Sequence, residues 1–213
     1  MNVKIDESID RTSWLRAMNA GEETDEALKE SMDEAERLLL SAAEPKAVYR
    51  IMDKENLGLS GLSIRRHLEG CDRVALMGAT IGSGVDQLIR KFQITDMAMA
   101  FILDCGASVV IESVCDEFSK YIGDNTDGYI TSRFSPGYGD FPIEYQKKLI
   151  GYIDGQRKIG LNVTQSSLMV PRKSVTALIG ISDKPVRGKP ATCDECVLKE
   201  KCILRKERKF CGD

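Results

Sequence analysis

The chain has 213 residues, of which 42% are hydrophobic and 30% are charged, enough for one well-buried core with a small appendage at most. Its formal net charge of -3 argues against a protein whose main task is to neutralise nucleic-acid phosphates. Residues 1–12 contain no apolar run like that of an export signal, and we expect no membrane-spanning segment elsewhere. Together these features predict a cytoplasmic protein that binds neither nucleic acid nor membrane.

Helical and strand patterns alternate along the chain without a regular repeat. Apolar residues at three- and four-residue spacing predict an amphipathic helix over residues 25–43, with Thr24 as its N-cap. Further helices are expected at 64–68, 85–92 and 142–153, and one or two buried helices at 95–122. Gly106 is a candidate break in this last stretch. Strands are expected at 47–52, 73–79, 129–133, 161–164 and 174–181.

This order of elements predicts an α+β fold, with a mixed, largely antiparallel central sheet covered by helices. Residues 183–190 contain two prolines and a glycine among charged residues, which indicates a linker. We therefore expect one globular domain over residues 1–182, followed by a linker and a cysteine tail over residues 183–213.

Seven cysteines without an export signal indicate reduced thiols or metal ligands. Cys71, Cys105 and Cys115 lie among aliphatic residues, where a free cysteine is usually a small buried side chain. The other four fall within the last 21 residues, at Cys193, Cys196, Cys202 and Cys211. Four cysteines in so short a span predict a small metal-binding tail rather than flexible thiols or redox disulfides. The spacing leaves open whether the metal is a [4Fe–4S] cluster or zinc.

Two other motifs favour structural interpretations. The turn of Gly82, Ser83 and Gly84 follows a predicted strand and precedes a helix, but it lacks the remaining residues of a dinucleotide or P-loop motif. His67 is the only histidine, and the residues from His67 to Gly70 resemble part of a cobalamin-binding signature. That signature requires an aspartate where this chain has Arg65, so we interpret His67 as an ordinary histidine at a helix end.

The most informative segment of the globular part is residues 133–140, with the sequence RFSPGYGD. Pro136 and Gly137 suit the second and third positions of a type II turn. Arg133 can bind a carboxylate through two hydrogen bonds, and the ring of Tyr138 can lie against a heterocycle. On spacing alone, a ligand site and a purely structural turn are equally consistent with this pattern.

Here the sequence resembles a known family, the activation domain of cobalamin-dependent methionine synthase. That domain binds S-adenosylmethionine with an Arg-x-x-Pro-Gly-Tyr loop, which this chain matches at Arg133, Pro136, Gly137 and Tyr138. The likeness continues in the same order through Pro142 and the short stretches 163–166, 169–171 and 174–175. It covers residues 108–181, and its combination of motifs is more specific than any single one.

The resemblance implies that Arg133 binds the methionyl carboxylate, the backbone of Ser135 and Gly137 contacts the adenosine, and Tyr138 packs against it. By offset from the loop, Asp127 and Asp116 fall where the family has acidic residues near the ligand. The implied role is reactivation, in which a Co(II) cobalamin is reduced by one electron and methylated by S-adenosylmethionine. A sulfonium methyl donor needs orientation more than an acid or a base, so one histidine suffices.

Three departures from the family stand out. Gly139 and Asp140 follow Tyr138 where the family has proline, which we expect to loosen the loop's exit. Arg172 and Lys173 replace small residues and add charge near the site. The chain also has no cobalamin, folate or homocysteine domain. We therefore expect an accessory protein or subunit rather than a stand-alone enzyme, acting on the cobalamin of a separate methionine synthase or related corrinoid protein.

Two alternatives remain open at the level of the sequence. In the first, the cysteine tail holds an iron–sulfur cluster and the chain reduces a corrinoid protein without using S-adenosylmethionine itself. In the second, zinc in the tail stabilises a nucleic-acid-binding protein, which the acidic charge and the few aromatic residues disfavour. For reactivation, the electron source is also open, with a flavodoxin or a ferredoxin as candidate donors.

Overall fold

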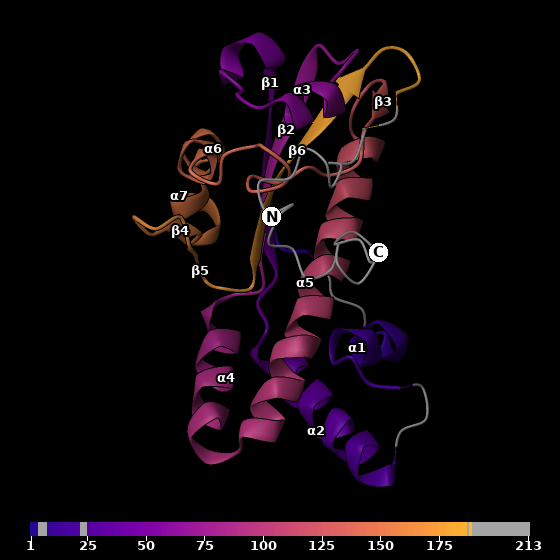
Figure 1. Cartoon of the computed structure of the whole chain (residues 1–213), viewed down its shortest axis with the longest axis vertical. Helices are drawn as coiled ribbons and strands as arrows, with labels where there is room; N and C mark the ends of the chain where they lie inside the picture. Colours follow the sequence, from indigo (N-terminus) through magenta and orange to yellow (C-terminus); the bar gives the residue numbers. More distant parts are fainter. Residues whose placement is uncertain (4–7, 22–24, 187, 189–213) are drawn as a thin grey trace. The chain divides into compact units, whose positions relative to one another are not determined.

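The computed structural model describes residues 1–3, 8–21, 25–186 and 188. It confirms the predicted α+β class, with a four-stranded sheet and covering helices (Figure 1). The strands of this sheet are β1 (Lys46–Asp53), β2 (Arg73–Thr80), β3 (Tyr129–Ile130) and β6 (Ser174–Ser182). A separate hairpin pairs β4 (Asn162–Val163) with β5 (Met169–Val170). The helices are α1 (Arg11–Ala17), α2 (Glu26–Ala42), η1 (Lys54–Leu57), α3 (Leu62–His67), α4 (Ser83–Thr95), α5 (Met97–Asp124), α6 (Tyr145–Ile153) and α7 (Gly155–Ile159).

The sheet has the order β1-β2-β6-β3 and is antiparallel. At one end of the β1–β2 pair the N–H of Lys54 donates to the carbonyl of Asp72, and at the other the N–H of Glu44 donates to the carbonyl of Ile81. The residue after β1 thus pairs with the residue before β2, and the reverse holds at the other end. The two strands therefore run in opposite directions, as in an antiparallel ladder. The central strands β2 and β6 are buried along nearly their whole length, which explains why their sequences are largely apolar.

The chain forms two compact units, and each is contributed by three stretches of sequence. Unit 1 contains Met1–Val48, Gly78–Tyr121 and Asp154–Val175, and unit 2 contains Tyr49–Met77, Ile122–Ile153 and the chain from Thr176 onward. The predicted division between a domain at 1–182 and a tail at 183–213 stays a prediction.

Unit 1 is built around Trp14, which is fully buried. Its indole Nε1–H donates to the carbonyl of Ile102 in α5 at 3.0 Å. A Cβ on Gly106 would lie 2.5 Å from the Trp14 ring and 2.8 Å from Leu39 of α2. Glycine at this position therefore lets α1 and α2 pack closely against α5, and the predicted break at Gly106 is wrong, because α5 runs through it without interruption.

Helix α5 is also long and apolar enough to cross a membrane. We had expected no segment of this length and composition. Length and composition alone give this result. Within the described part of the chain, 61% of its most apolar window is buried against other residues, as in the core helix of a globular protein.

Unit 2 holds α3 and α6 beside its part of the sheet. The hydroxyl of Tyr145, in α6, donates to the carbonyl of Leu57 at 2.9 Å. Burial raises the pKa of this phenol well above its usual value, so Tyr145 remains a neutral hydrogen-bond donor. This bond connects the start of α6 to the end of η1.

The remaining differences from the sequence-based expectations lie at element ends and in short elements. Helix α2 has Asp25 as its N-cap, where the carboxylate accepts from the N–H of Leu28 at 2.8 Å, whereas the expected cap Thr24 lies outside the described residues. Helix α6 begins at Tyr145 rather than at Pro142. Strand β3 is shorter than expected, and α1, α7 and β5 were not predicted.

Candidate functional site

The segment with the predicted binding motif lies in unit 2, between β3 and α6. Phe134 fixes its first half to the sheet, because Phe134 and Leu178 of β6 donate backbone hydrogen bonds to each other, both of 2.9 Å. The Phe134 side chain is 2% exposed. Its neighbour Arg133 therefore projects from a backbone that is held on one side by the sheet.

Residues 135–138 form the tight turn that the sequence predicted. The N–H of Tyr138 donates to the carbonyl of Ser135 at 3.2 Å, and Gly137 has a φ of 95°. A type II turn needs a positive φ at its third position and favours proline at its second. Pro136 and Gly137 occupy these positions, so the turn's shape is set by local backbone chemistry.

The exit of the turn is held by hydrogen bonds, where we expected the missing proline to loosen it. The N–H of Phe141 donates to the carbonyl of Tyr138 at 3.0 Å, and the N–H of Gly137 donates to the carbonyl of Phe141 at 2.9 Å. Gly139 supplies the positive φ, 57°, that this second bend uses. The two bends together make residues 135–141 a closed structure.

Asp140 joins this structure to α3. Its carboxylate accepts from the backbone N–H groups of Leu62 at 2.6 Å and Ser63 at 2.8 Å, the first two residues of the helix. These bonds, that from Leu62 foremost, hold the pKa of the Asp140 carboxyl below its usual value. Asp140 is therefore ionised at neutral pH and satisfies N–H groups that a helix start leaves without intrahelical partners.

The loop presents several kinds of polar group from one short stretch. Arg133 and Ser135 are half-buried, and Gly137 is exposed. The Tyr138 ring is 56% exposed and stands edge-on to Phe134, with 6.0 Å between the ring centroids. A guanidinium, the backbone of a rigid turn and a partly exposed ring suit a ligand that carries both a carboxylate and a flat heterocycle.

The two carboxylates predicted to lie near the ligand are both exposed. Asp127 lies in the turn between α5 and β3, where its backbone carbonyl accepts from the guanidinium of Arg73 at 3.0 Å. Asp116 lies on the part of α5 that belongs to unit 1. The structure thus brings the four loop residues together, while the predicted places of Asp116 and Asp127 beside a ligand stay predictions.

His67 lies against the segment between β3 and the loop, a position that no pattern in the sequence predicts. It ends α3 and is 1% exposed. Its Nε2 lies 3.1 Å from the hydroxyl of Thr131 and 2.9 Å from the carbonyl of Ser132. These partners are 64 and 65 positions away in the chain, so no local pattern could have identified them.

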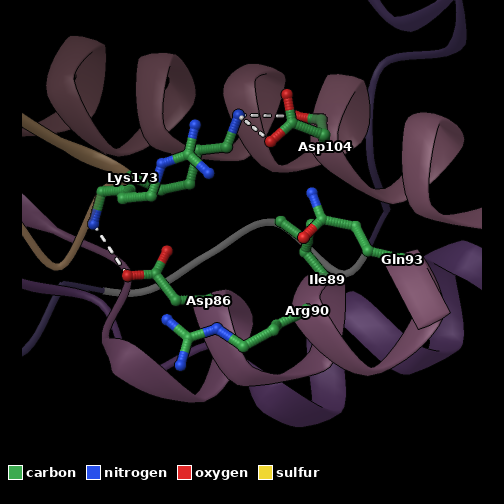
Figure 2. Close-up of a pocket in the computed structure, with 7 residues that line it drawn as sticks. Asp86, Ile89, Arg90, Gln93, Asp104 and Lys173 are labelled. Carbon is green, nitrogen blue, oxygen red and sulfur yellow. Dashed lines mark hydrogen bonds and ion pairs between the residues drawn. The ribbon is translucent and has the colours of Figure 1, made fainter.

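Unit 1 contains a separate polar cleft between α4, α5 and the segment before β6 (Figure 2). The Lys173 amino group, on a side chain that is 13% exposed, donates to the backbone carbonyl of Asp104 at 2.8 Å and forms an ion pair with its carboxylate at 3.0 Å. The carboxylate of Asp86 accepts from the backbone N–H of Arg172 at 2.8 Å. Both carboxylates therefore fix the chain entering β6, which indicates a structural role for the cleft.

The Gly82 turn is also structural. Gly82 has a φ of 88° at the start of α4, and a Cβ on Gly84 would lie 2.6 Å from the carbonyl of Ala42. Glycine is thus needed for the turn itself and for the close approach of α4 to the end of α2. These contacts support the strand-to-helix turn over a nucleotide site.

The three scattered cysteines, Cys71, Cys105 and Cys115, are buried, as predicted. Burial raises the pKa of the Cys71 and Cys105 thiols, which therefore stay protonated and poorly reactive. Among the described residues, no group of three or more His, Cys, Asp or Glu side chains is arranged to hold a metal ion. The four cysteines predicted to bind a metal lie outside the described residues. These are Cys193, Cys196, Cys202 and Cys211.

Comparison with known proteins adds evidence on the fold. The sequence matches no protein-family model and no curated protein. The structure, in contrast, superimposes on a crystal structure of the MetH reactivation domain bound to AdoHcy, with a TM-score of 0.57 over 94% of this chain and 82% of that chain. This chain has the fold of that domain. The two sequences are 15% identical, so the likeness to the MetH reactivation domain shows the fold alone.

Proposed function

We propose that this chain binds S-adenosylmethionine through residues 133–138 and supports reductive methylation of the Co(II) cobalamin of a methionine synthase or a related corrinoid methyltransferase. The observation that carries this proposal is the anchored type II turn, which follows Arg133 and presents Gly137 and Tyr138 at the surface. The sequence resemblance over residues 108–181 and the fold of a domain solved with AdoHcy support the choice of ligand.

Each loop residue has a distinct role in this proposal. Arg133 binds the methionyl carboxylate through its two-pronged guanidinium, which a lysine cannot replace. The backbone of Ser135 and Gly137 contacts the adenosine, and the Tyr138 ring packs against it. Asp127 lies near the ammonium or sulfonium charge, which a carboxylate stabilises, and Asp116 stays a candidate for the same role on the sequence resemblance alone.

The bound ligand supplies an activated methyl group, and the protein's contribution is to orient it. In-line transfer requires the reacting atoms to be held at close range and in the correct direction. The hydrogen bonds at the loop's exit and the contact of Asp140 with α3 hold the turn in one shape before any ligand binds. Binding then requires little ordering of the loop, which favours affinity.

Isothermal titration calorimetry tests the binding step. The wild-type protein should bind S-adenosylmethionine, and Arg133→Ala should weaken binding by at least about 30-fold, because truncating one partner of a buried charged pair costs about 2 to 5 kcal/mol. Arg133→Lys should recover only part of the loss. Arg157→Ala is the matched control, since Arg157 is an 80% exposed surface arginine that pairs with Asp154 of the same short segment. Equal affinity of wild type and Arg133→Ala would rule out this site.

A comparison of two ligands tests the acidic residues. S-adenosylhomocysteine lacks the methyl group and the positive charge of the sulfonium. If Asp127 stabilises that charge, Asp127→Asn should weaken binding of S-adenosylmethionine by about threefold or more and leave S-adenosylhomocysteine nearly unchanged. Asp116→Asn is tested in the same way. Equal losses for both ligands would place the carboxylate near the ammonium, which both ligands carry, and no loss would remove it from the site.

The reactivation step requires a functional assay. A methionine synthase that lacks its own activation domain, in its Co(II) form and supplied with a reductant, should regain activity when this protein and S-adenosylmethionine are both present. Omission of either should prevent the recovery. Recovery that needs the protein but not S-adenosylmethionine would instead identify an electron-transfer module.

We also propose that the four tail cysteines hold a metal, on the basis of their spacing in the sequence alone. Because reactivation consumes an electron, a [4Fe–4S] cluster suits the proposed function better than zinc. Anaerobic purification followed by iron and sulfide analysis distinguishes the two. Stoichiometric zinc without iron would assign a structural role to the tail.

A further inference from the structure

The single histidine of the chain is buried beside the loop to which we assign ligand binding. His67 is 1% exposed, and its ring centroid lies 4.8 Å from that of Phe134, which anchors the loop to β6. A Cβ on Gly188 would overlap the imidazole, so the backbone of Gly188 packs directly on its edge. His67 therefore occupies a closely fitted position in which its orientation is fixed by neighbours from other parts of the chain.

The hydrogen bonds define the protonation of the ring nitrogen that faces the loop. The carbonyl of Ser132, 2.9 Å away, can only accept, so Nε2 carries the hydrogen. The hydroxyl of Thr131 accepts from the N–H of Gly180 at 2.8 Å and donates to the same Ser132 carbonyl at 2.9 Å. Both lone pairs of that carbonyl are thereby used, one by His67 and one by Thr131.

The Ser132 carbonyl belongs to the peptide that joins Ser132 to Arg133. A carbonyl held by two donors cannot rotate, and the peptide plane that contains it also contains the N–H of Arg133. On the other side of Arg133, Phe134 is bonded to Leu178. The backbone of Arg133 is thus fixed on both sides, by His67 together with Thr131 before it and by the sheet after it.

We propose that His67 is a positioning residue for Arg133, which directs the guanidinium to the ligand carboxylate by fixing the preceding peptide. This inference rests on the proposed function of the loop. It assigns to His67 no contact with the ligand and no proton transfer. The imidazole acts as a hydrogen-bond donor of fixed direction, and its loss should change binding through Arg133 rather than through global stability.

Two substitutions of His67 distinguish the effect of its Nε2–H donor on binding from the effect of its flat ring. His67→Phe keeps a flat ring against Phe134 and removes the Nε2 donor, whereas His67→Gln places an amide N–H at a similar reach. We expect His67→Phe to weaken S-adenosylmethionine binding by about 5- to 10-fold, the value of one well-made hydrogen bond, and His67→Gln to restore most of it. Trp14→Phe is the matched control, because it also removes one buried ring N–H donor, in unit 1.

A double-mutant cycle tests whether His67 acts through Arg133. In the Arg133→Ala background, adding His67→Phe should weaken binding by less than about twofold, because the group that it positions is gone. Additive losses would overturn the inference and indicate a general effect on the fold. Loss of binding in His67→Gln, with its fold intact, would also overturn it, since the donor is retained. If His67→Phe fails to fold, His67→Met, which also lacks the Nε2–H donor, takes its place in the cycle.

Hydrogen exchange in the absence of ligand separates this inference from the proposed function. The amides of residues 132–135, 137 and 138 should exchange faster in His67→Phe than in wild type, while those of β2 keep their protection. Binding by wild type together with undiminished binding by His67→Phe would overturn the positioning role alone. Absence of S-adenosylmethionine binding by wild type would overturn the proposed function. Unchanged exchange of the loop amides in His67→Phe would overturn the positioning role, whether or not the wild type binds the ligand.

Discussion

Asp140 and Ser63 exchange two hydrogen bonds across 77 positions of sequence: the Ser63 N–H donates to the Asp140 carboxylate at 2.8 Å, and the Asp140 N–H donates to the Ser63 hydroxyl at 3.5 Å. The end of the candidate loop therefore acts as the cap of α3, a helix whose own N-cap residue, Gly61, has no side chain to offer. Asp140 thus fixes the end of the loop to the start of α3.

Replacement of this capping carboxylate should destabilise the protein. Asp140→Ala should lower the free energy of unfolding by about 1 kcal/mol, the usual cost of losing a helix cap. Urea unfolding followed by circular dichroism measures this change. Asp72→Ala is the control, because Asp72 is an exposed aspartate of the same unit, and it should change the value by less than about 0.5 kcal/mol. Equal effects of the two substitutions would contradict the capping role.

The contribution of Asp140 should also depend on pH. Its pKa is lower in the folded protein than the ordinary value of 3.8, so the carboxylate stabilises the fold at and above that value. The stabilisation is lost as the pH falls through the lower folded pKa, where the folded protein also binds the proton. The difference in unfolding free energy between wild type and Asp140→Asn should therefore be largest near neutral pH and shrink as the pH falls below 3.8. A difference that stays constant across this range would show that the charge is not involved.

Two glycines in helices should respond to alanine with opposite signs. Gly106→Ala should destabilise the protein by about 1 to 3 kcal/mol, because its Cβ would lie 2.5 Å from the buried Trp14 ring. Gly151→Ala, in α6, has no atom within 4 Å of the new Cβ. It should stabilise the protein by about 0.5 to 1 kcal/mol through helix propensity. Thermal and urea unfolding of the two variants gives the comparison, and a neutral Gly106→Ala would show that α1 is not packed closely on α5.

Lys173, in the unit 1 cleft, should contribute more to the free energy of unfolding than a surface lysine does. Its amino group makes hydrogen bonds of 2.8 Å to both the Asp104 carbonyl and the Ser108 hydroxyl. Lys173→Met keeps the length of the side chain and removes the donor, and it should cost about 2 kcal/mol of unfolding free energy. Lys120→Met, at an exposed position on α5, is the control and should be nearly neutral. If the two variants are equally stable, the cleft does not hold the chain entering β6.

Local chemistry explains what could be predicted from the sequence. The strands β2 and β6 are largely apolar, and the turn at Pro136 and Gly137 depends only on the conformations that these two residues allow. Gly106 was misjudged because helix propensity treats glycine as a weak point, whereas here its missing side chain makes room for Trp14. Local preference and tertiary packing acted in opposite directions, and packing determined the structure.

The supports of the loop could not be predicted, because they depend on contacts between distant parts of the chain. Nothing around His67 indicates that its imidazole reaches Ser132, and nothing around Asp140 indicates that it caps a helix formed by residues 62–67. The residues proposed to contact the ligand lie within one short motif and could be found by pattern. The residues that hold this motif in place come from separate elements, and only the fold brings them together.

The close packing of Trp14 against α5 has a practical consequence for experiments on this protein. Trp14 is the only tryptophan of the chain and lies in unit 1, whereas His67 is the only histidine and lies in unit 2. Tryptophan fluorescence therefore reports the surroundings of one unit, and the imidazole proton resonances report those of the other. Each unit carries a natural spectroscopic label, so events at the loop and unfolding around α5 can be followed separately in the unmodified protein.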